Sequence, residues 1–130
     1  MKSKFLFLSL GIFFIMGLLH LAGSYLYLYW TAWWFDNLVH FTGGVGVGFF
    51  IVWFFLFSGL VWKDVPTRNK IFVTSLSLTL LVGLGWELFE YVNGLTQSTE
   101  SYALDTVHDL LADTLGGAIA GFIAGLKSHA

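Results

Sequence analysis

The sequence predicts an all-α integral membrane protein, a four-helix bundle in a single transmembrane domain over residues 1–130. Only 11% of its residues are charged, against about 25% in soluble domains. Lipid is therefore the expected solvent, and helices are the default for a chain that crosses lipid, because lipid cannot form hydrogen bonds with exposed backbone groups. The second observation is a set of four long apolar segments, at about residues 5–29, 37–62, 70–92 and 106–126.

The first segment follows Lys2 and Lys4, and a basic start before an apolar run also occurs in secretory signal peptides. Ala22-Gly23-Ser24 resembles a cleavage site in the same way. The apolar run is longer than the roughly 7–15 residues of a signal peptide, so we interpret it as a retained span, with a signal peptide as the less favoured alternative. A helix that continues to Tyr29 would place His20 roughly 14 Å below its end, near the bilayer centre.

The third observation is that the basic residues occupy alternate connections. They precede the first segment, flank the connection between the second and third, and follow the fourth: Lys2, Lys4, Lys63, Arg68, Lys70 and Lys127. Because Lys and Arg favour the cytoplasmic side, we expect both termini to be cytoplasmic, in a multi-pass protein of the cell inner (plasma) membrane. The Tyr and Trp residues of segment 25–34 would then form an aromatic belt at the outer interface.

All but one of the eight acidic residues fall on the opposite, outer side. They are Asp36, Glu87, Glu90, Glu100, Asp105, Asp109 and Asp113. The outer connections hold no Lys or Arg, and an isolated charge in a low dielectric is costly. These carboxylates must therefore be protonated, paired with His, solvated in a water-filled cavity or bound to a cation. Of the seven, we expect Asp105 to cap the fourth helix and Glu100 to be an ordinary loop residue.

Helical spacing brings several of these groups onto common faces. Asp36 and His40 are one turn apart at the outer end of the second segment, and Glu87 and Glu90 share a face of the third. An acid and a His one turn apart can hold one ion, or the carboxylate can orient the imidazole. Ionisable groups inside a membrane are functional by default, so we expect the two pairs to converge on one site.

In the fourth segment, Asp109 and Asp113 continue into a stripe of small residues. The stripe includes Gly117-x-x-x-Gly121-x-x-x-Gly125, a pattern that permits close helix packing, so this face is expected to point into protein. His108 lies roughly 140° from Asp113 around the helix and is a weaker candidate. We interpret His20 as a neutral His bonded to a backbone or hydroxyl group.

Together these patterns predict a divalent-metal site. Its expected ligands are Asp36, His40, Glu87, Glu90, Asp109 and Asp113. Oxygen ligands with an imidazole suit Mg²⁺, Mn²⁺, Zn²⁺ or Fe²⁺, whereas thiolate ligation is excluded because the chain has no Cys. Glu87 and Asp109 are the expected catalytic groups, as general acid and base. Without a metal, the same carboxylates could form a proton relay.

Three ordered motifs resemble a known family. They are DNLVHF at 36–41, WELFEY at 86–91 and DTVHDLLADTLGG at 105–117. Over about residues 36–121 the chain resembles the YjdF-like inner-membrane proteins and, more distantly, the VanZ-like proteins, which implies a small helical bundle in a bacterial or archaeal envelope. The first group implies no particular activity, and the second implies a role in glycopeptide (teicoplanin) resistance. VanZ-like proteins usually carry Asn in place of Asp113 and Gln in place of Glu90, so the more acidic site here fits cation binding better.

We weigh three functions. The first is a metal-dependent membrane hydrolase or phosphotransferase that acts on a lipid-linked or envelope substrate. The second is a component of a cation or proton transporter, and the third is a non-catalytic partner that binds another membrane protein through the Gly stripe. The lipid bilayer is a partner in each case, and a homodimer is compatible with all three. A net charge of -2 gives no support for nucleic-acid binding.

Overall fold

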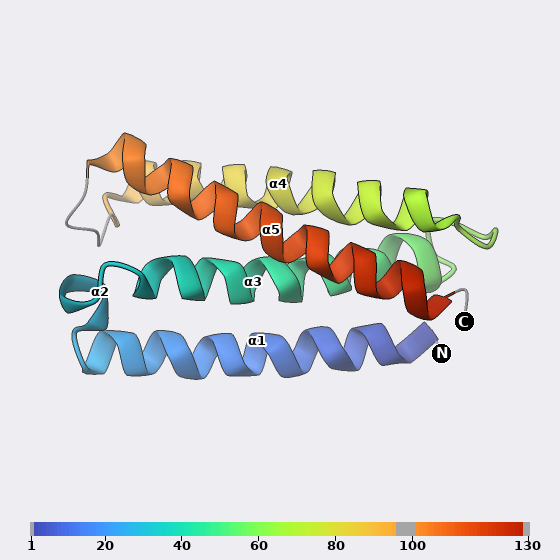
Figure 1. Ribbon diagram of the computed structural model, residues 1–130, viewed down its shortest axis with the longest axis horizontal. Coiled ribbons are helices and arrows are strands. Elements are labelled where there is room, and N and C mark those ends of the chain that lie inside the picture. Colours follow the sequence, from blue (N-terminus) through green and yellow to red (C-terminus); the bar gives the residue numbers. More distant parts are fainter. Residues whose placement is uncertain (1, 96–100, 129–130) are drawn as a thin grey trace.

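The computed structural model describes residues 2–95 and 101–128, and in these ranges every element of regular structure is a helix. Four long helices lie side by side along the long axis of the molecule (Figure 1). They are α1 (Lys2–Tyr25), α3 (Phe35–Ile51), α4 (Arg68–Asn93) and α5 (Tyr102–Ser128). A short helix, α2 (Leu28–Thr31), joins α1 to α3, and α3 continues into a π-helical segment, η1 (Val52–Phe57).

Within the described ranges, four helical stretches are long and apolar enough to cross a membrane. They are Ser3–Tyr25, Phe35–Phe57, Arg68–Asn93 and Tyr102–Ser128. The prediction of an all-α protein with four helices able to span a membrane is thereby confirmed.

The first two helical stretches end earlier than the apolar runs that predict them. Helix α1 stops at Tyr25 because Tyr27 adopts a left-handed conformation, with φ of 56°, which a helix cannot continue through. The second stretch stops at Phe57, shortly before Gly59, whose φ is 80°. His20 therefore lies only about 8 Å from the end of its helix, and the predicted distance of roughly 14 Å is wrong.

The last two helices begin before the residues that the apolar pattern indicates. Helix α4 begins at Arg68, and its N-cap residue Thr67 accepts a hydrogen bond from the backbone N–H of Lys70 at 3.2 Å. Helix α5 begins at Tyr102, so Asp105 lies within its first turn instead of capping it. The carboxylate there still stabilises the positive end of the helix dipole, but the predicted cap is wrong.

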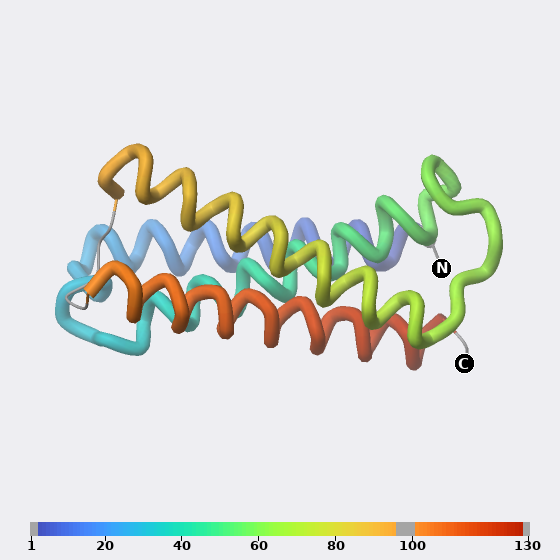
Figure 2. The backbone as a smooth tube through the Cα atoms, turned by 90° about the horizontal axis from the view of Figure 1, so that it is seen from above, coloured from blue at the N-terminus to red at the C-terminus, as the bar shows by residue number. Residues whose placement is uncertain are grey.

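The bundle has two chemically different ends. Both termini and the connection from η1 to α4 lie at one end, which we call the termini end, and α2 lies at the other, the α2 end (Figures 1 and 2). Arg68 and Lys70 begin α4 and Lys127 ends α5, which places these basic residues at the termini end. Asp36 and Asp105 lie in the first turns of α3 and α5, at the α2 end.

Small residues let α5 approach both α3 and α4. A Cβ atom added to Gly116 would lie 2.5 Å from the carbonyl oxygen of Phe41 in α3, and one added to Gly117 would lie 2.6 Å from the Thr79 side chain in α4. The buried face of α5 consists of Asp109, Asp113, Gly116, Gly117, Ala120, Gly121, Ala124 and Gly125. The small-residue stripe thus packs inside the chain, and it carries two acids into the bundle.

The half of the bundle nearer the termini is a conventional packed core. Its buried apolar residues come from all four long helices and η1: Phe5, Phe49, Val52, Leu56, Ile71, Ala120 and Ala124. The Ser9 hydroxyl donates to the Gly46 carbonyl at 2.8 Å, and the Ser75 hydroxyl donates to the Gly117 carbonyl at 2.7 Å. Both bonds join neighbouring helices, as hydroxyl groups commonly do in membrane bundles.

Candidate metal centre

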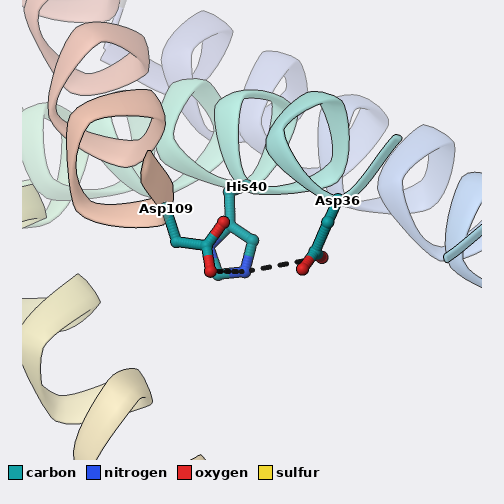
Figure 3. A group of neighbouring side chains, drawn as sticks. All are labelled: Asp36, His40 and Asp109. Atoms are coloured by element: carbon teal, nitrogen blue, oxygen red, sulfur yellow. Dashed lines mark ion pairs between the residues drawn. The ribbon is translucent and has the colours of Figure 1, made fainter. Parts of the chain in front are cut away.

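His40 of α3 lies among three carboxylates. Its Nε2 atom is 3.8 Å from an oxygen of Asp36, one turn earlier on the same helix, and 3.7 Å from an oxygen of Asp109 on α5. Figure 3 shows these two acids on either side of the ring. The other ring nitrogen, Nδ1, is 3.4 Å from an oxygen of Asp113. One imidazole therefore contacts acids from two helices, and Asp109 is only 2% exposed.

Two glycines make room for Asp113. A Cβ atom on Gly83 of α4 would lie 2.8 Å from Asp113 Oδ2, and one on Gly44 of α3 would overlap the Asp113 backbone. The acid thus fits between α3 and α4 only because neither helix has a side chain there. This close packing brings the Asp113 carboxylate to the His40 ring.

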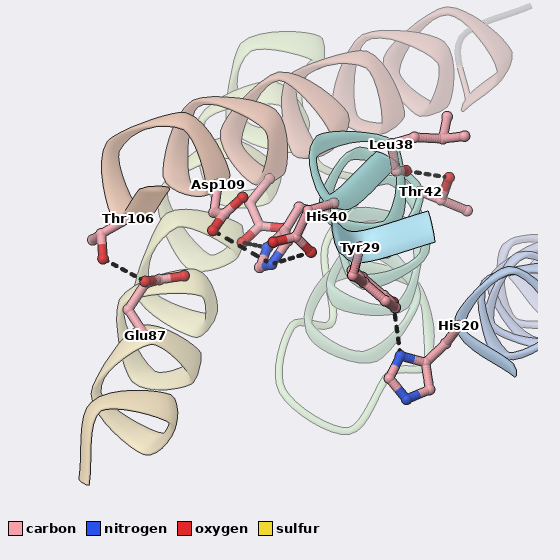
Figure 4. A network of polar contacts seen from close by, with 10 residues as sticks. His20, Tyr29, Leu38, His40, Thr42, Glu87, Thr106 and Asp109 are labelled. Carbon is pink, nitrogen blue, oxygen red and sulfur yellow. Dashed lines mark hydrogen bonds and ion pairs between the residues drawn. The ribbon is translucent and has the colours of Figure 1, made fainter. Parts of the chain in front are cut away.

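Helix α4 contributes Glu87, which is 5% exposed. Its Oε2 atom accepts a hydrogen bond from the Thr106 hydroxyl at 2.7 Å (Figure 4). Its backbone carbonyl accepts one from the Tyr102 hydroxyl at 3.1 Å. Its Oε1 atom is buried and has no hydrogen-bond partner within the described ranges. An unpartnered carboxylate oxygen in such a place is costly and indicates a missing positive or donating group.

Ligand atoms of the cluster lie close enough to share an ion. Asp36, His40 and Asp109 form one group, and His40, Glu87 and Glu90 form a second, with ligand atoms within 4.8 Å of one another in each. Two ligand atoms about 2.1 Å from the same ion lie at most about 4.2 Å apart. The measured distances of 3.7 and 3.8 Å from His40 Nε2 fit this limit.

The structure thus brings the six residues of the predicted site to one region. Five of them belong to the two groups, and the sixth, Asp113, reaches the opposite nitrogen of the imidazole. The remaining candidates lie elsewhere. His108 lines a separate shallow cavity with Trp33 and Asn37, and Glu100 is outside the described residues.

Two parts of the site could not be read from helical spacing. Thr106 and Tyr102 hold Glu87 across the α4–α5 interface, and nothing in the sequence pairs them with that acid. Tyr29 was predicted to belong to an aromatic belt at the outer interface, and the structure shows it buried within the protein, with its hydroxyl 2.8 Å from Nδ1 of His20. Burial, together with the nearby Asp36 carboxylate, raises the pKa of Tyr29 to about 12, so the phenol stays protonated at neutral pH and can donate to His20.

A cavity adjoins the cluster on the side of α1. Its volume is about 340 Å³, and Asp36, His40, Glu90 and Asp113 all line it. Asp105 lines it as well, so this acid, expected to act only as a cap, faces the same space. The cluster is therefore reachable from a cavity of the size that small-molecule sites have.

These features define a class of protein: a four-helix membrane protein with an acidic and His cluster buried at one end of the bundle. The comparisons with known proteins agree with the class and give a family. Residues 3–129 match the family described as Predicted membrane protein (DUF2238), and the chain belongs to that family. No curated protein and no solved structure matches the chain. The distant likeness to VanZ-like proteins stays a prediction.

Proposed function

We propose that this protein binds a divalent metal ion in the cluster at the α2 end. The observation that carries the proposal is the buried, unpartnered Oε1 atom of Glu87, in a region where the described residues include five further acids. The residues that would hold the ion are Asp36, His40, Glu87, Glu90 and Asp109. Oxygen and imidazole donors of this kind suit Mg²⁺, Mn²⁺, Zn²⁺ or Fe²⁺.

Asp113 has a different role in the proposal from the one that spacing predicts. A metal-bound His usually donates its other ring N–H to a carboxylate, which fixes the tautomer and the orientation of the ring. Asp113 lies at Nδ1 of His40, whereas Asp36 and Asp109 lie at Nε2. We therefore assign Nε2 as the ligand atom and Asp113 as the residue that orients it.

The position of the cluster favours an enzyme over a transporter. A bound divalent ion would supply a Lewis acid for a phosphoryl oxygen or a water molecule. Glu87, which Thr106 holds at Oε2, and Asp109, which lies beside His40, are the carboxylates that would exchange a proton as acid and base, each through an oxygen that does not hold the ion. With the termini cytoplasmic, the cluster faces the outer leaflet, and the proposed reaction is hydrolysis or group transfer on an envelope lipid.

Transport has weaker support. A conduction path needs polar groups along the whole bundle, but within residues 2–95 and 101–128 the membrane-spanning stretches carry no acid near the termini end. Ser9 and Ser75, the buried polar residues there, donate to backbone carbonyls. The Gly stripe of α5 is buried within the chain, so it cannot be the surface that binds another membrane protein.

Elemental analysis of the purified protein, combined with equilibrium dialysis against Mn²⁺ or Zn²⁺, tests the proposal. We expect about one tightly held ion per chain in the wild type and a loss of at least about tenfold in affinity in Glu87→Gln, because residues that bind the ion directly matter at least as much as the residues that orient them. Asp64→Asn is the matched control, since Asp64 is an exposed acid in the connection between η1 and α4. Equal metal content in wild type and Glu87→Gln would refute the proposal.

A further inference from the structure

The cavity beside the cluster extends along α3. Asp36 and Val47 both line it, and their spacing on α3 corresponds to about 16 Å at about 1.5 Å per residue. Its volume of about 340 Å³ falls at the lower end of the range of roughly 300–1,000 Å³ found for ligand sites. The cavity thus reaches from the α2 end to about the middle of a bilayer of roughly 30 Å.

The cavity lies between α1 and α4, over a floor formed by α3. Helix α1 packs on α3, and α4 packs on α3 and α5, which leaves the space between α1 and α4 to the cavity. Gly17 of α1 and Gly83 of α4 are among its lining residues. A Cβ atom added to Gly17 would meet nothing within 4 Å. Gly17 therefore borders open space where α1 lines the cavity, and it is not packed tightly against another helix.

The chemistry of the lining changes along the cavity. Its deep part is apolar, with Phe13 and Met16 of α1 opposite Val47 of α3. Its part nearest the α2 end is acidic, with Asp36, Glu90 and Asp105. Among the described residues that line it there is no Lys or Arg. From the membrane centre outward, the lining is thus first apolar and then charged. A lipid has its acyl chains and its headgroup in the same order.

We propose that this cavity binds one membrane lipid whose headgroup carries an ammonium group, with an acyl chain in the apolar part and the ammonium beside Asp36, Glu90 and Asp105. Charge decides the headgroup, because opposite charges attract strongly at short range in a medium of low dielectric. An anionic head would meet acids with no Lys or Arg to offset them.

Aromatic side chains at the mouth add to this preference. Tyr29 and Trp86 both line the cavity near the acids, and aromatic faces attract ammonium groups. The Tyr29 hydroxyl is already bonded to His20, which holds its ring in place. The proposal goes beyond metal binding, since the α1 wall and, at the mouth, Asp105, Tyr29 and Trp86 belong to neither group of candidate metal ligands.

Native mass spectrometry of the detergent-solubilised protein tests the proposal. The protein is mixed with equal amounts of phosphatidylethanolamine and phosphatidylglycerol that carry identical acyl chains. We expect one phosphatidylethanolamine to be retained, with a preference of about tenfold. Gly17→Leu fills the cavity and should reduce retention by about tenfold or more. The matched control is Gly11→Leu, because Gly11 is also on α1 with open space around it but does not line the cavity.

A second variant tests the headgroup. Asp105→Asn keeps the volume of the mouth and removes a charge that belongs to neither group of candidate metal ligands, so the preference for phosphatidylethanolamine should fall. Equal retention of both lipids by the wild type, or equal loss in Gly17→Leu and Gly11→Leu, would overturn the proposal. So would a preference for phosphatidylglycerol that disappears on chelation, which would mean that a metal ion holds the phosphate.

The same samples separate this proposal from the proposed metal site. Metal content is measured on each variant, and Gly17→Leu should leave it unchanged, because Gly17 is outside both groups of candidate ligands. If the protein retains phosphatidylethanolamine selectively but takes up no metal ion in dialysis, the lipid site is supported and the metal site is not. Metal binding with no lipid preference would do the reverse.

Discussion

The two halves of the bundle use the same helices for different purposes. Near the termini end, the buried Ser9 and Ser75 hydroxyls each donate to the backbone of a neighbouring helix, and near the middle of the bundle the buried Thr79 hydroxyl has no hydrogen-bond partner among the described residues. Near the α2 end, the buried polar groups are carboxylates that face a single imidazole and a cavity, and one oxygen of Glu87 has no partner among the described residues. The first half satisfies its two serine hydroxyls internally, whereas the second half is built to receive something from outside.

The glycines of the bundle differ in what surrounds them. In α5, Gly117 and Gly121 lie against Thr79 and Ser75, so the helices close up and exclude everything else. In α1, Gly17 has open space around it and lines the cavity. A glycine in a membrane helix therefore indicates close packing only where a second helix meets it, and its neighbours decide whether it packs or leaves space.

Of the variants that test this difference between the two halves, His40→Ala is expected to have the largest effect, and it acts on metal binding at the α2 end. His40 belongs to both groups of candidate ligands, so its loss should weaken metal binding by about 100-fold or more, the upper end of effects seen for residues that only support ligands. Equilibrium dialysis measures the change. His108→Ala serves as the control, because His108 lines a different cavity. If the two variants bound metal equally well, His40 would not be a ligand.

The packing of α5 predicts the next largest effect. Gly116→Ala would press a methyl group against the Phe41 carbonyl and the Val45 backbone N, which cannot move away as a side chain can, so we expect a loss of about 1–3 kcal/mol. Unfolding in mixed micelles, followed by Trp fluorescence, measures the change. Gly85→Ala is the control, because an added Cβ there meets nothing within 4 Å. Equal stabilities would show that the helices pack less closely than described.

A smaller effect is expected from Thr106→Val, which removes the donor to Glu87 and keeps the shape of the side chain. The freed carboxylate should lose its fixed position, and metal affinity should fall by about tenfold. Thr42→Val is the control, since the Thr42 hydroxyl donates to the Leu38 carbonyl within its own helix. An unchanged affinity in Thr106→Val would remove Thr106 from the site.

The smallest effect concerns the other half of the bundle. Ser75→Ala removes the hydroxyl that donates to Gly117, and hydrogen bonds between membrane helices contribute about 0.6 kcal/mol on average. We expect a loss of that size in the unfolding free energy and no change in metal content. Ser77→Ala, at an exposed position of the same helix, should change neither. Reduced metal binding in Ser75→Ala would mean that the two halves are coupled.

Much of this arrangement could be predicted from the sequence. The scarcity of charge and the length of the apolar runs predict four helices, because lipid leaves few alternatives. The spacing of Asp36 and His40, and of Asp109 and Asp113, predicts shared faces, because helical geometry is local. These predictions depend only on residues that are close in the chain.

The parts that could not be predicted depend on contacts between helices or on single backbone angles. The left-handed Tyr27 ends α1 early and turns Tyr29 inward, although Tyr is not a residue that favours this conformation. The bond from Thr106 to Glu87 joins two helices at a register that no spacing rule gives. The cavity likewise depends on how α1 and α4 are held apart by α3.

The most direct test of the account is pulsed electron paramagnetic resonance of the Mn²⁺-loaded protein, which detects nitrogen atoms bound to the ion. The account predicts the signal of one imidazole nitrogen in the wild type, its loss in His40→Ala and its retention in His20→Ala. A nitrogen signal that survives in His40→Ala, or its absence from wild-type protein that holds Mn²⁺, would contradict the assignment of the cluster as a metal site.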